Sequence, residues 1–476
     1  MIVDNSVSGD SRVQKEAISV AKLGYDVTLL GLGLNGDPND NLDLPGVKLI
    51  RIKATIELDQ KKRLTPPFNP IYFLAFPNQQ AIFNSRRRLE IARMNLEQVS
   101  AVTPWKHWPQ SVYVYMMKGA HYFRGALFSL AIKHGSKAEA SKLAIIRTQI
   151  TKRLYLGNPG PRITPLIKDL ELQAWPIIKS VNPDIIHAQD FRAIGIGARA
   201  VKYRNSTGKP TKLVYDAHEF LPGVESLPKR AREGYVIDEA RCINSADVVI
   251  TVSDDIADML VERHKLQSTP YVVVNAPTVT KDPNFLLDIR SELKIGQDEI
   301  LGVYLGGLAK HRGIDAVVEG LRNLPTVHIA LVSPLNEYGK TIFDRIASTE
   351  LANRLHFLPY VDPKNIVQYI STADFGIAPY LHMVNQENSL PSKFYEYASA
   401  GLPIVGSDVR KLSETIKENS LGEVFRAGDG ADFASAVNRL ISSANWPFRI
   451  QPKSGWSWED QELILADTYR KLLSSD

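Results

Sequence analysis

The sequence predicts a two-domain α/β fold whose parallel sheets are covered by helices on both faces. From residue 171 onward, short runs rich in β-branched residues alternate with segments of helical periodicity. These runs are continuously apolar, which is typical of strands buried on both faces of a parallel sheet. The chain has 476 residues. Because this is too long for one hydrophobic core, we expect two domains.

The first elements are a helix and a strand. Residues 12–24 have helical periodicity and end on Gly24, which is typical of a left-handed cap. The run "YDVTLLGL" (25–32) predicts a strand. Only "MIV" is available for a strand before the helix, so either the first strand is very short or it begins upstream.

The later strands form a regular series. They are expected at 184–188, 212–217, 247–252, 271–275, 300–307, 327–333, 355–360, 375–380 and 403–407. Helices are expected between them, and the helix at 363–373 would place Ile366, Tyr369 and Ile370 on one face. A short helix is expected at 392–400, between a Pro-Ser pair and a Gly-Leu-Pro sequence.

Two prolines follow a strand within "NAPTVTKDPNFL" (275–286) and predict the domain boundary. We predict an N-terminal domain at 1–278, a C-terminal domain at 279–455 and a C-terminal helix within 456–476. The sequence leaves open whether that helix packs on its own domain or crosses back to the first.

Residues 55–170 do not join the alternation of strands and helices and predict a largely helical insertion. Residues 51–170 contain 20 Lys or Arg and 6 Asp or Glu, although the net charge of the whole chain is only +5. Three interpretations stay open. The insertion is a solvated elaboration, a surface that docks on an anionic membrane through Arg86–Arg88 and nearby aromatic residues, or a surface that binds an acidic polymer or partner.

Cysteine usage and hydropathy indicate the compartment. Cys242 is the single cysteine, which excludes a disulfide within the chain and fits a reducing compartment. No run of 18 apolar residues predicts a spanning helix, and the first residues lack the order of a signal peptide. We expect a cytoplasmic chain, on the inner face of the membrane if the insertion docks there.

Polar residues follow several strands, where open parallel sheets bind their ligands. His187 lies at the end of the strand at 184–188, and Gln189 and Asp190 follow it. Asp216, His218 and Glu219 lie at the end of the strand at 212–217 and just after it.

Two predicted helix starts are basic. Lys310, His311 and Arg312 follow Gly306 and Gly307, and Lys393 lies in the first turn of the helix at 392–400. A cation at a helix N-terminus is unfavourable by up to about 1 kcal/mol unless an anion binds there. A diphosphate bridging both starts would explain them, and the alternative is two solvated basic loops.

Glu396 lies one turn after Lys393, on the same helix face. A carboxylate in this place could accept hydrogen bonds from ribose hydroxyls, as in other dinucleotide sites. The alternative is a local ion pair with Lys393.

Several motifs together resemble a known family. In the C-terminal half these are "LGGLAKHRGID", "LHFLPYV", "ADFGIAPY" and above all "NSLPSKFYEYASAGLPIVGSD" (388–408). In the N-terminal half they are "DSRVQKEAISVAKLGYDVTLLG", "PDIIHAQD", "VYDAHEF" and "ADVVITVS". They resemble the retaining nucleotide-sugar glycosyltransferases of family 4, or group 1. The resemblance implies the GT-B fold, with two Rossmann-like domains facing a cleft, and transfer of a sugar to an acceptor hydroxyl.

The resemblance also implies roles for individual residues. The implied catalytic residues are His218, Arg312 and Lys393. The implied donor-binding residues are Gly306, Gly307, Lys310, Tyr360, Val361, Asn388, Ser392 and Glu396. The implied acceptor-side residues are Gly9, Asp10, Arg12 and Asp190. Asn388 stands where the family's usual pair of glutamates has its first member.

No metal and no cofactor are expected, because Arg, Lys and backbone N–H groups supply the positive charge that a diphosphate needs. The implied partners are a nucleotide-sugar donor, a glycan or lipid-linked acceptor and, through the insertion, an anionic membrane; no nucleic acid is expected. Two alternatives stay open. One is a non-catalytic partner or carbohydrate-binding subunit, suggested by Asn388 and Gly307. The other is a different enzyme of the same fold, such as a sugar-nucleotide epimerase.

Overall fold

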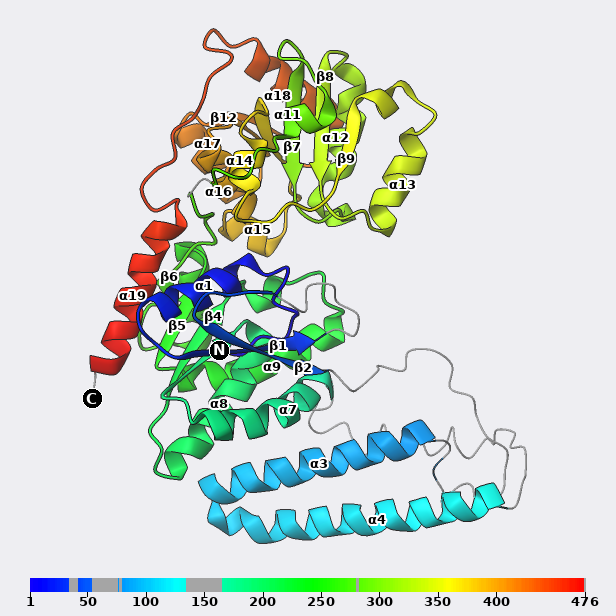
Figure 1. The fold of residues 1–476 in the computed structure, drawn as a ribbon, viewed down its shortest axis with the longest axis vertical. Helices are drawn as coiled ribbons and strands as arrows, with labels where there is room; N and C mark the ends of the chain where they lie inside the picture. Colours follow the sequence, from blue (N-terminus) through cyan, green and yellow to red (C-terminus); the bar gives the residue numbers. More distant parts are fainter. Residues whose placement is uncertain (34–41, 54–75, 77–78, 134–164, 280–281, 475–476) are drawn as a thin grey trace. The chain divides into compact units, whose positions relative to one another are not determined.

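The computed structural model describes residues 1–33, 42–53, 76, 79–133, 165–279 and 282–474 (Figure 1). Parts of the predicted insertion, at 55–75, 77–78 and 134–164, lie outside the described residues. The chain divides into two compact units. The first contains residues 1–222 and 226–249, and the second contains residues 223–225 and 250–476. The domain boundaries expected at 278 and 455 stay predictions.

The strands of the N-terminal half of the chain confirm the expected parallel pairing. β1 (Val27–Gly33) pairs in parallel with β2 (Val47–Lys53). A four-stranded sheet has the order β3 (Ile185–Gln189), β4 (Lys212–Ala217), β5 (Val248–Thr251) and β6 (Tyr271–Val272). The division between the units falls within β5.

The first strand is very short. Ile2 makes isolated parallel bridges to Leu30 of β1 and to Ala188 of β3. A single residue therefore links the two sheets. β2 was not predicted, because "VKLIRIK" alternates basic and apolar residues and lacks the continuous apolar run of a central strand.

The helices of the first unit form two groups. The helices that surround the sheet are α1 (Ser11–Lys22), α7 (Pro165–Val181), α8 (Phe191–Ser206) and α9 (Lys229–Cys242). α3 (Gln79–Val102) and α4 (His107–Lys133) lie side by side and are joined through η1 (Pro104–Lys106) (Figure 1). α3 also contacts α7 and α8. The described part of the insertion is therefore helical, as predicted.

The second unit contains a six-stranded parallel sheet. Its strands are β7 (Ile300–Leu305), β8 (Val327–Val332), β9 (Leu355–Leu358), β10 (Phe375–Ala378), β11 (Ile404–Ser407) and β12 (Gly422–Phe425). Their order is β12-β11-β10-β7-β8-β9. The strand order reverses between β7 and β10, and open α/β sheets bind ligands at such a switch point.

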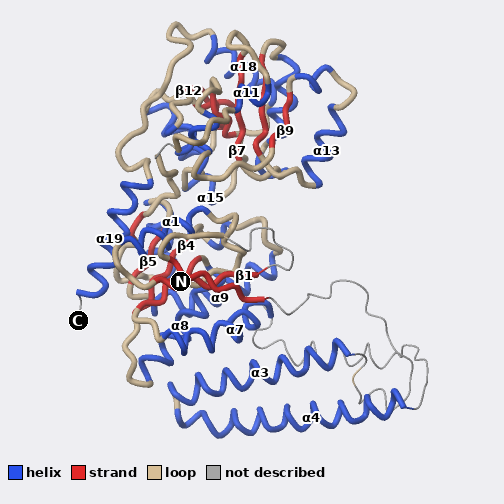
Figure 2. Tube along the Cα trace, in the orientation of Figure 1, coloured by secondary structure: helices blue, strands red, loops and turns tan. Residues whose placement is uncertain are grey.

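Helices cover both faces of this sheet (Figure 2). They are α12 (Ile314–Gly320), α13 (Glu337–Ile346), α14 (Ile366–Ile370), α16 (Ser392–Ser399), α17 (Arg410–Glu418) and α18 (Gly430–Ile441). Short helices α11 (Ile289–Leu293) and α15 (Val384–Asn388) lie in connections. Ile366, Tyr369 and Ile370 are all buried, as predicted.

Two further helices belong to the second unit. α10 (Asp254–His264) follows β5, and α19 (Trp458–Ser474) ends the described chain. The backbone N–H of Trp458 donates to the Pro277 carbonyl, and that of Val274 donates to Gln461 Oε1. These bonds hold α19 beside β6. Within the described residues, no helix combines the length and the hydrophobicity needed to cross a membrane.

Candidate functional site

The turn after β7 lies at the switch point of the second sheet. Gly306 has φ +117° and Gly313 has φ +74°, both in the region that favours glycine. A Cβ on Gly313 would lie 1.7 Å from the carbonyl oxygen of Pro379. The backbone of this turn therefore touches the segment that follows β10. The guanidinium carbon of Arg312 lies 5.5 Å from the ring centroid of Tyr380 in that segment.

The basic residues of this turn precede a helix that was expected to begin near Gly313–Ile314. Lys310, His311 and Arg312 form a 3-10 turn, and Gly313 separates that turn from α12. The first turn of α12 instead contains Asp315, which suits its positive end. α12 begins at Ile314, as expected, and the three basic residues lie in the turn immediately before it, on the other side of the left-handed Gly313.

α16 brings Lys393 and Glu396 to the same place. The N-cap of α16 is Pro391, which makes no side-chain cap, and its first turn has no acidic residue. Lys393 Nζ lies 3.2 Å from Glu396 Oε1. Lys393 Cε lies 3.3 Å from the position of a Cβ on Gly306. The structure thus brings together Gly306, Lys393 and Glu396, and it also contains the ion pair of the alternative interpretation.

Glu396 has one oxygen without a partner. The residue is 7% exposed, and its Oε2 is buried with no hydrogen bond from any described residue. An unsatisfied buried polar atom costs about 1–3 kcal/mol, and more when it is charged. A ligand that donates a hydrogen bond to Oε2 would remove this cost.

Tyr360 and Val361 follow β9. Burial, with Asp362 and Glu396, raises the pKa of Tyr360 to about 12, so its hydroxyl stays protonated at neutral pH. The Tyr360 side chain is more than half exposed, whereas Val361 packs against the core. Tyr360 can therefore present a flat ring or a hydroxyl donor to a ligand.

Tyr397 positions α16 on the sheet. Its hydroxyl accepts a hydrogen bond from Leu305 N at 2.9 Å and donates one to Ile377 O at 3.0 Å. The ring occupies the place that a side chain at Gly376 would need, since a Cβ there would lie 2.3 Å from Tyr397 Cγ. Tyr397 therefore ties α16 to the carboxyl ends of β7 and β10. Its neighbour in sequence is Glu396.

Replacing Tyr397 with phenylalanine is expected to lower the free energy of unfolding by about 1–3 kcal/mol. The substitution leaves Leu305 N and Ile377 O without the hydroxyl between them. Urea unfolding checks the result. Tyr338→Phe is the matched control, because that hydroxyl bonds the half-exposed Asp315 and its loss should cost less. Equal losses in the two variants would contradict the role given to Tyr397.

The polar groups of Asn388 are already paired within the second unit. Its Nδ2 donates to Val384 O at 2.6 Å, and its Oδ1 accepts from the guanidinium of Arg410 at 2.8 Å. Its carbonyl accepts from the Ser253 hydroxyl at 2.6 Å. Asn388 therefore braces α15 against α17 in this structure, and a role in donor recognition stays a prediction. Ser392, at the start of α16, is half-buried.

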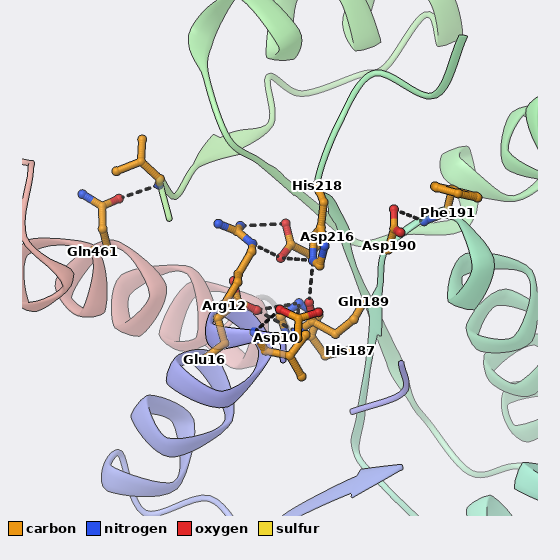
Figure 3. Close-up of polar contacts among 12 residues, drawn as sticks. Asp10, Arg12, Glu16, His187, Gln189, Asp190, Phe191, Asp216, His218 and Gln461 are labelled. Atoms are coloured by element: carbon orange, nitrogen blue, oxygen red, sulfur yellow. Dashed lines mark hydrogen bonds and ion pairs between the residues drawn. The ribbon is translucent and has the colours of Figure 1, made fainter. Parts of the chain in front are cut away.

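The second cluster lies at the carboxyl ends of β3 and β4 in the first unit (Figure 3). Arg12 of α1 binds Asp216 with two bonds, Nε to Oδ2 at 2.7 Å and Nη2 to Oδ1 at 2.8 Å. Arg12 is 3% exposed and Asp216 is fully buried. Such paired bonds are the geometry in which a guanidinium binds a carboxylate most specifically. Arg12 is therefore internal to the cluster.

His218 extends this cluster toward the surface. Its Nε2 lies 3.2 Å from Asp216 Oδ2 and 3.0 Å from Gln189 Oε1. Burial alone would lower the pKa of His218, but the charge and hydrogen bond of Asp216 outweigh it and raise the pKa to about 10. Burial likewise opposes ionisation of Asp216, but Arg12 and His218 hold its pKa well below the usual range. At neutral pH, His218 is therefore a cation and a hydrogen-bond donor.

Glu16 and His187 complete the cluster in neutral form. Burial and the charge of Asp216 raise the pKa of Glu16 to about 8, and burial lowers the pKa of His187 to about 3. Gln189 Nε2 donates to Glu16 Oε2 at 2.6 Å. Glu16 was missed in the sequence, although it follows Arg12 by four residues on the buried side of α1.

Glu16, His187 and Asp216 offer ligand atoms within 4.8 Å of one another, which is the spacing of a metal site. The donor set does not fit a metal. Both oxygens of Asp216 accept bonds from Arg12, and the Arg12 guanidinium lies 3.2 Å from Glu16 Oε1. The guanidinium already supplies the positive charge that the ionised Asp216 needs.

The remaining acceptor-side residues lie at helix starts. Asp10 caps α1 by accepting from Val13 N at 3.2 Å, and its other oxygen accepts from Asn5 Nδ2 at 2.7 Å. Asp190 accepts from Phe191 N at the start of α8, at φ +67°, and burial raises its pKa to about 7. Gly9 is exposed, with open space around its Cα. Asp10 has a structural role, and binding roles for these residues stay predictions.

Comparisons with known families match both units. The model described as "Glycosyl transferases group 1" matches residues 300–443, and that described as "Glycosyltransferase Family 4" matches residues 128–278. Together the two matches cover more than half of the chain.

Two curated relatives are similar at low identity. The D-inositol 3-phosphate glycosyltransferase of Nocardia farcinica is 23% identical over 254 residues, which are 50% of this chain and 55% of that protein. The putative teichuronic acid biosynthesis glycosyltransferase TuaH of Bacillus subtilis is 24% identical over 146 residues, 31% of this chain and 36% of that protein. The chain therefore spans about half the length of the first relative and about a third of the second.

Solved structures show the same fold. The sucrose-phosphate synthase of Thermosynechococcus elongatus has a TM-score of 0.62 at 15% identity and covers 100% of this chain and 99% of its own. A glycosyltransferase from Rickettsia africae has a TM-score of 0.58 at 13% identity, and the match covers 100% of this chain and 98% of that protein. HepE of Anabaena, in complex with UDP-glucose, has a TM-score of 0.51 at 18% identity, and the match covers 74% of this chain and 90% of that protein. The chain belongs to the group 1, family 4 glycosyltransferases and has their GT-B fold.

Proposed function

We propose that the protein transfers a sugar from a nucleoside diphosphate sugar to an acceptor hydroxyl, with retention of the anomeric configuration. The unpartnered, buried Oε2 of Glu396 carries this proposal. A carboxylate oxygen at the carboxyl edge of a parallel sheet suits the hydroxyls of a ribose. The complex of HepE with UDP-glucose supports a nucleotide-sugar donor.

The diphosphate would be the leaving group. When the bond between the anomeric carbon and the diphosphate oxygen breaks, negative charge builds on that oxygen. Lys393 and Arg312, with the backbone N–H group of Gly307, would stabilise this charge before and during cleavage. Lys310, in the same exposed turn, would add a further cation. These groups provide the charge without a metal, so we propose a metal-independent reaction.

In the first unit, we propose that His218 donates a hydrogen bond to the sugar through Nδ1. Its Nε2 already lies within hydrogen-bond distance of Asp216 and Gln189. Because its pKa is raised to about 10, His218 is already protonated at neutral pH and does not act as a general base there. Arg12 would be a positioning residue that fixes Asp216. The acceptor would be a glycan or a lipid-linked hydroxyl, and we propose that it is presented at a membrane surface.

His218→Gln is expected to change how stability depends on pH. A histidine whose pKa is raised to about 10 stabilises the fold fully below about pH 6.5, and this contribution disappears as pH rises through 10. The difference in unfolding free energy between wild type and variant should therefore be larger at pH 6 than near pH 10. Urea titrations at both pH values check it. A difference that is the same at both would show that His218 is not held as a cation.

The test of the proposed function is a panel of nucleotide sugars incubated with the full chain. We expect release of nucleoside diphosphate with one donor, a rise in melting temperature with the matching nucleotide, and a rate unaffected by a chelator. Retention is tested by comparing the anomeric configuration of the product with that of the donor. A panel in which no donor is cleaved and no nucleotide raises the melting temperature would remove the proposal.

A further inference from the structure

α4 carries an exposed apolar surface that is not covered by the helices described beside it in the first unit. Its main packing partner is α3, which lies between α4 and the helices α7 and α8 (Figure 1). Trp105 in η1 and Trp108 in α4 are each 75% exposed, and Tyr115 is 72% exposed. Large apolar residues are exposed singly on many proteins, but a continuous group of them marks an interaction surface.

The exposed residues of α4 lie on one side of the helix. We call the large apolar ones the aromatic face: Trp108, Val112, Tyr113, Tyr115, Met116, Tyr122 and Phe123. At about 100° per residue, these positions span an arc of about 180°. Val114 is buried, and His121 contacts Ser85 of α3 on the other side. The pattern is therefore a stripe that α3 does not cover.

Along α4 and the turn before it, the charge has one sign. Residues 98–133 contain four basic residues, Lys106, Lys118, Arg124 and Lys133, and no Asp or Glu. Arg86, Arg88 and Arg93 on α3 are also exposed. A helix with an aromatic side, Lys or Arg beside it and no acid is typical of a helix that lies in a membrane interface. Trp and Tyr are also the residues that gather at the headgroup level of bilayers.

Two other occupants fit this chemistry less well. A second copy of the chain would bring the same positive charge against itself, with no acidic residue in 98–133 to neutralise it. A membrane-crossing α4 would place Lys118 and Arg124 in hydrocarbon, where charged side chains are costly. A bilayer surface with anionic lipids complements both the aromatic residues and the charge.

We propose that the aromatic face of α4, together with Trp105, inserts into the headgroup region of a bilayer that contains anionic lipids. The basic residues beside it bind the lipid phosphates. This proposal deepens the proposed function, on which it rests for a membrane-presented acceptor, by naming the surface that binds. The surface itself is independent of the Glu396 site.

The first arm of the test removes the aromatic residues. The full chain is co-sedimented with vesicles of phosphatidylcholine alone and with vesicles that also contain phosphatidylglycerol. We expect stronger binding to the anionic vesicles. Combining Trp108→Ser, Tyr115→Ser and Tyr122→Ser should weaken that binding by roughly tenfold or more. The matched control combines Leu286→Ser, Phe343→Ser and Leu463→Ser, which are exposed apolar residues of the second unit, and should bind as wild type does.

The second arm removes charge. Lys106→Gln and Lys118→Gln should each weaken binding to anionic vesicles by about fivefold, and added salt should weaken wild type further. Lys340→Gln and Lys364→Gln, at exposed positions of the second unit, are the controls. Tryptophan emission should shift to shorter wavelength with anionic vesicles, and the double variant Trp105→Phe, Trp108→Phe should lose most of that shift.

Three results would overturn the proposal. They are failure of wild type to bind anionic vesicles, equal binding by the aromatic triple variant, and a wild-type dimer that the triple variant dissociates. Far-UV circular dichroism of the triple variant confirms that α4 still forms. Donor cleavage measured without vesicles tests the Glu396 site independently of membrane binding. Loss of cleavage with intact vesicle binding would therefore contradict the proposed reaction and leave the membrane surface standing.

Discussion

Replacing Glu396 with glutamine is expected to weaken nucleotide binding by about 10- to 160-fold. Hydrogen bonds to a charged acceptor contribute about 1.5–3 kcal/mol, and 1.36 kcal/mol corresponds to a factor of ten. Glutamine keeps the size of the side chain but loses the charge, and its Nε2 offers N–H groups in place of an acceptor. Isothermal titration with the matching nucleoside diphosphate measures the loss.

The same substitution should leave the free protein folded. Oε2 has no hydrogen-bond partner among the residues that the structure describes, so an amide there removes no bond that the atom makes to them. The melting temperature without ligand should therefore stay the same or rise, while the rise induced by nucleotide disappears. Glu423→Gln is the matched control, because that carboxylate pairs with Arg439 on the surface of the same unit. Unchanged nucleotide affinity in Glu396→Gln would contradict a ribose at this carboxylate.

Replacing Arg12 with leucine is expected to lower the free energy of unfolding by about 3–5 kcal/mol. Removing one partner of a buried ion pair leaves the other charge without compensation. Asp216 would keep only His218 as a cationic partner, and Glu16 would lose its neighbouring guanidinium. Urea unfolding of the purified chain measures the change.

Two further variants keep this prediction testable if Arg12→Leu does not fold. Arg12→Lys retains the charge but loses the paired bonds, so it should fold with a smaller loss. Arg439→Leu breaks an exposed ion pair of similar length and should cost less than about 1 kcal/mol. A loss in Arg12→Leu as small as that of Arg439→Leu would mean that the cluster contributes little to stability.

Most of the central strands of both units were predictable, because a continuous run of apolar residues indicates a strand that is buried on both faces. The strands at β3, β4, β7 and β8 begin within one residue of their predicted positions. β12 was missed for the same reason as β2. Its sequence "GEVF" is only partly buried at the sheet edge, so it lacks a continuous apolar run.

The site was predictable only where its residues are close in sequence. Lys393 and Glu396 are three residues apart on one helix, so helical spacing predicts their contact. Arg12 and Asp216 are 204 residues apart, and only the folded sheet brings them together. Tyr397 was missed because a buried helical tyrosine resembles a core residue in sequence, and its two hydrogen bonds depend on strand ends far along the chain.

The hydrogen bonds of Tyr397 determine how the proposed donor site around Glu396 acquires its shape. Because the hydroxyl joins the ends of β7 and β10 to α16, the residue next to it, Glu396, is positioned as the sheet of the second unit folds. A nucleotide would then meet a carboxylate whose orientation was fixed beforehand, and little conformational entropy would be lost on binding. Variation in donor preference would consequently arise at side chains around α16, since changing its anchor would alter the sheet itself.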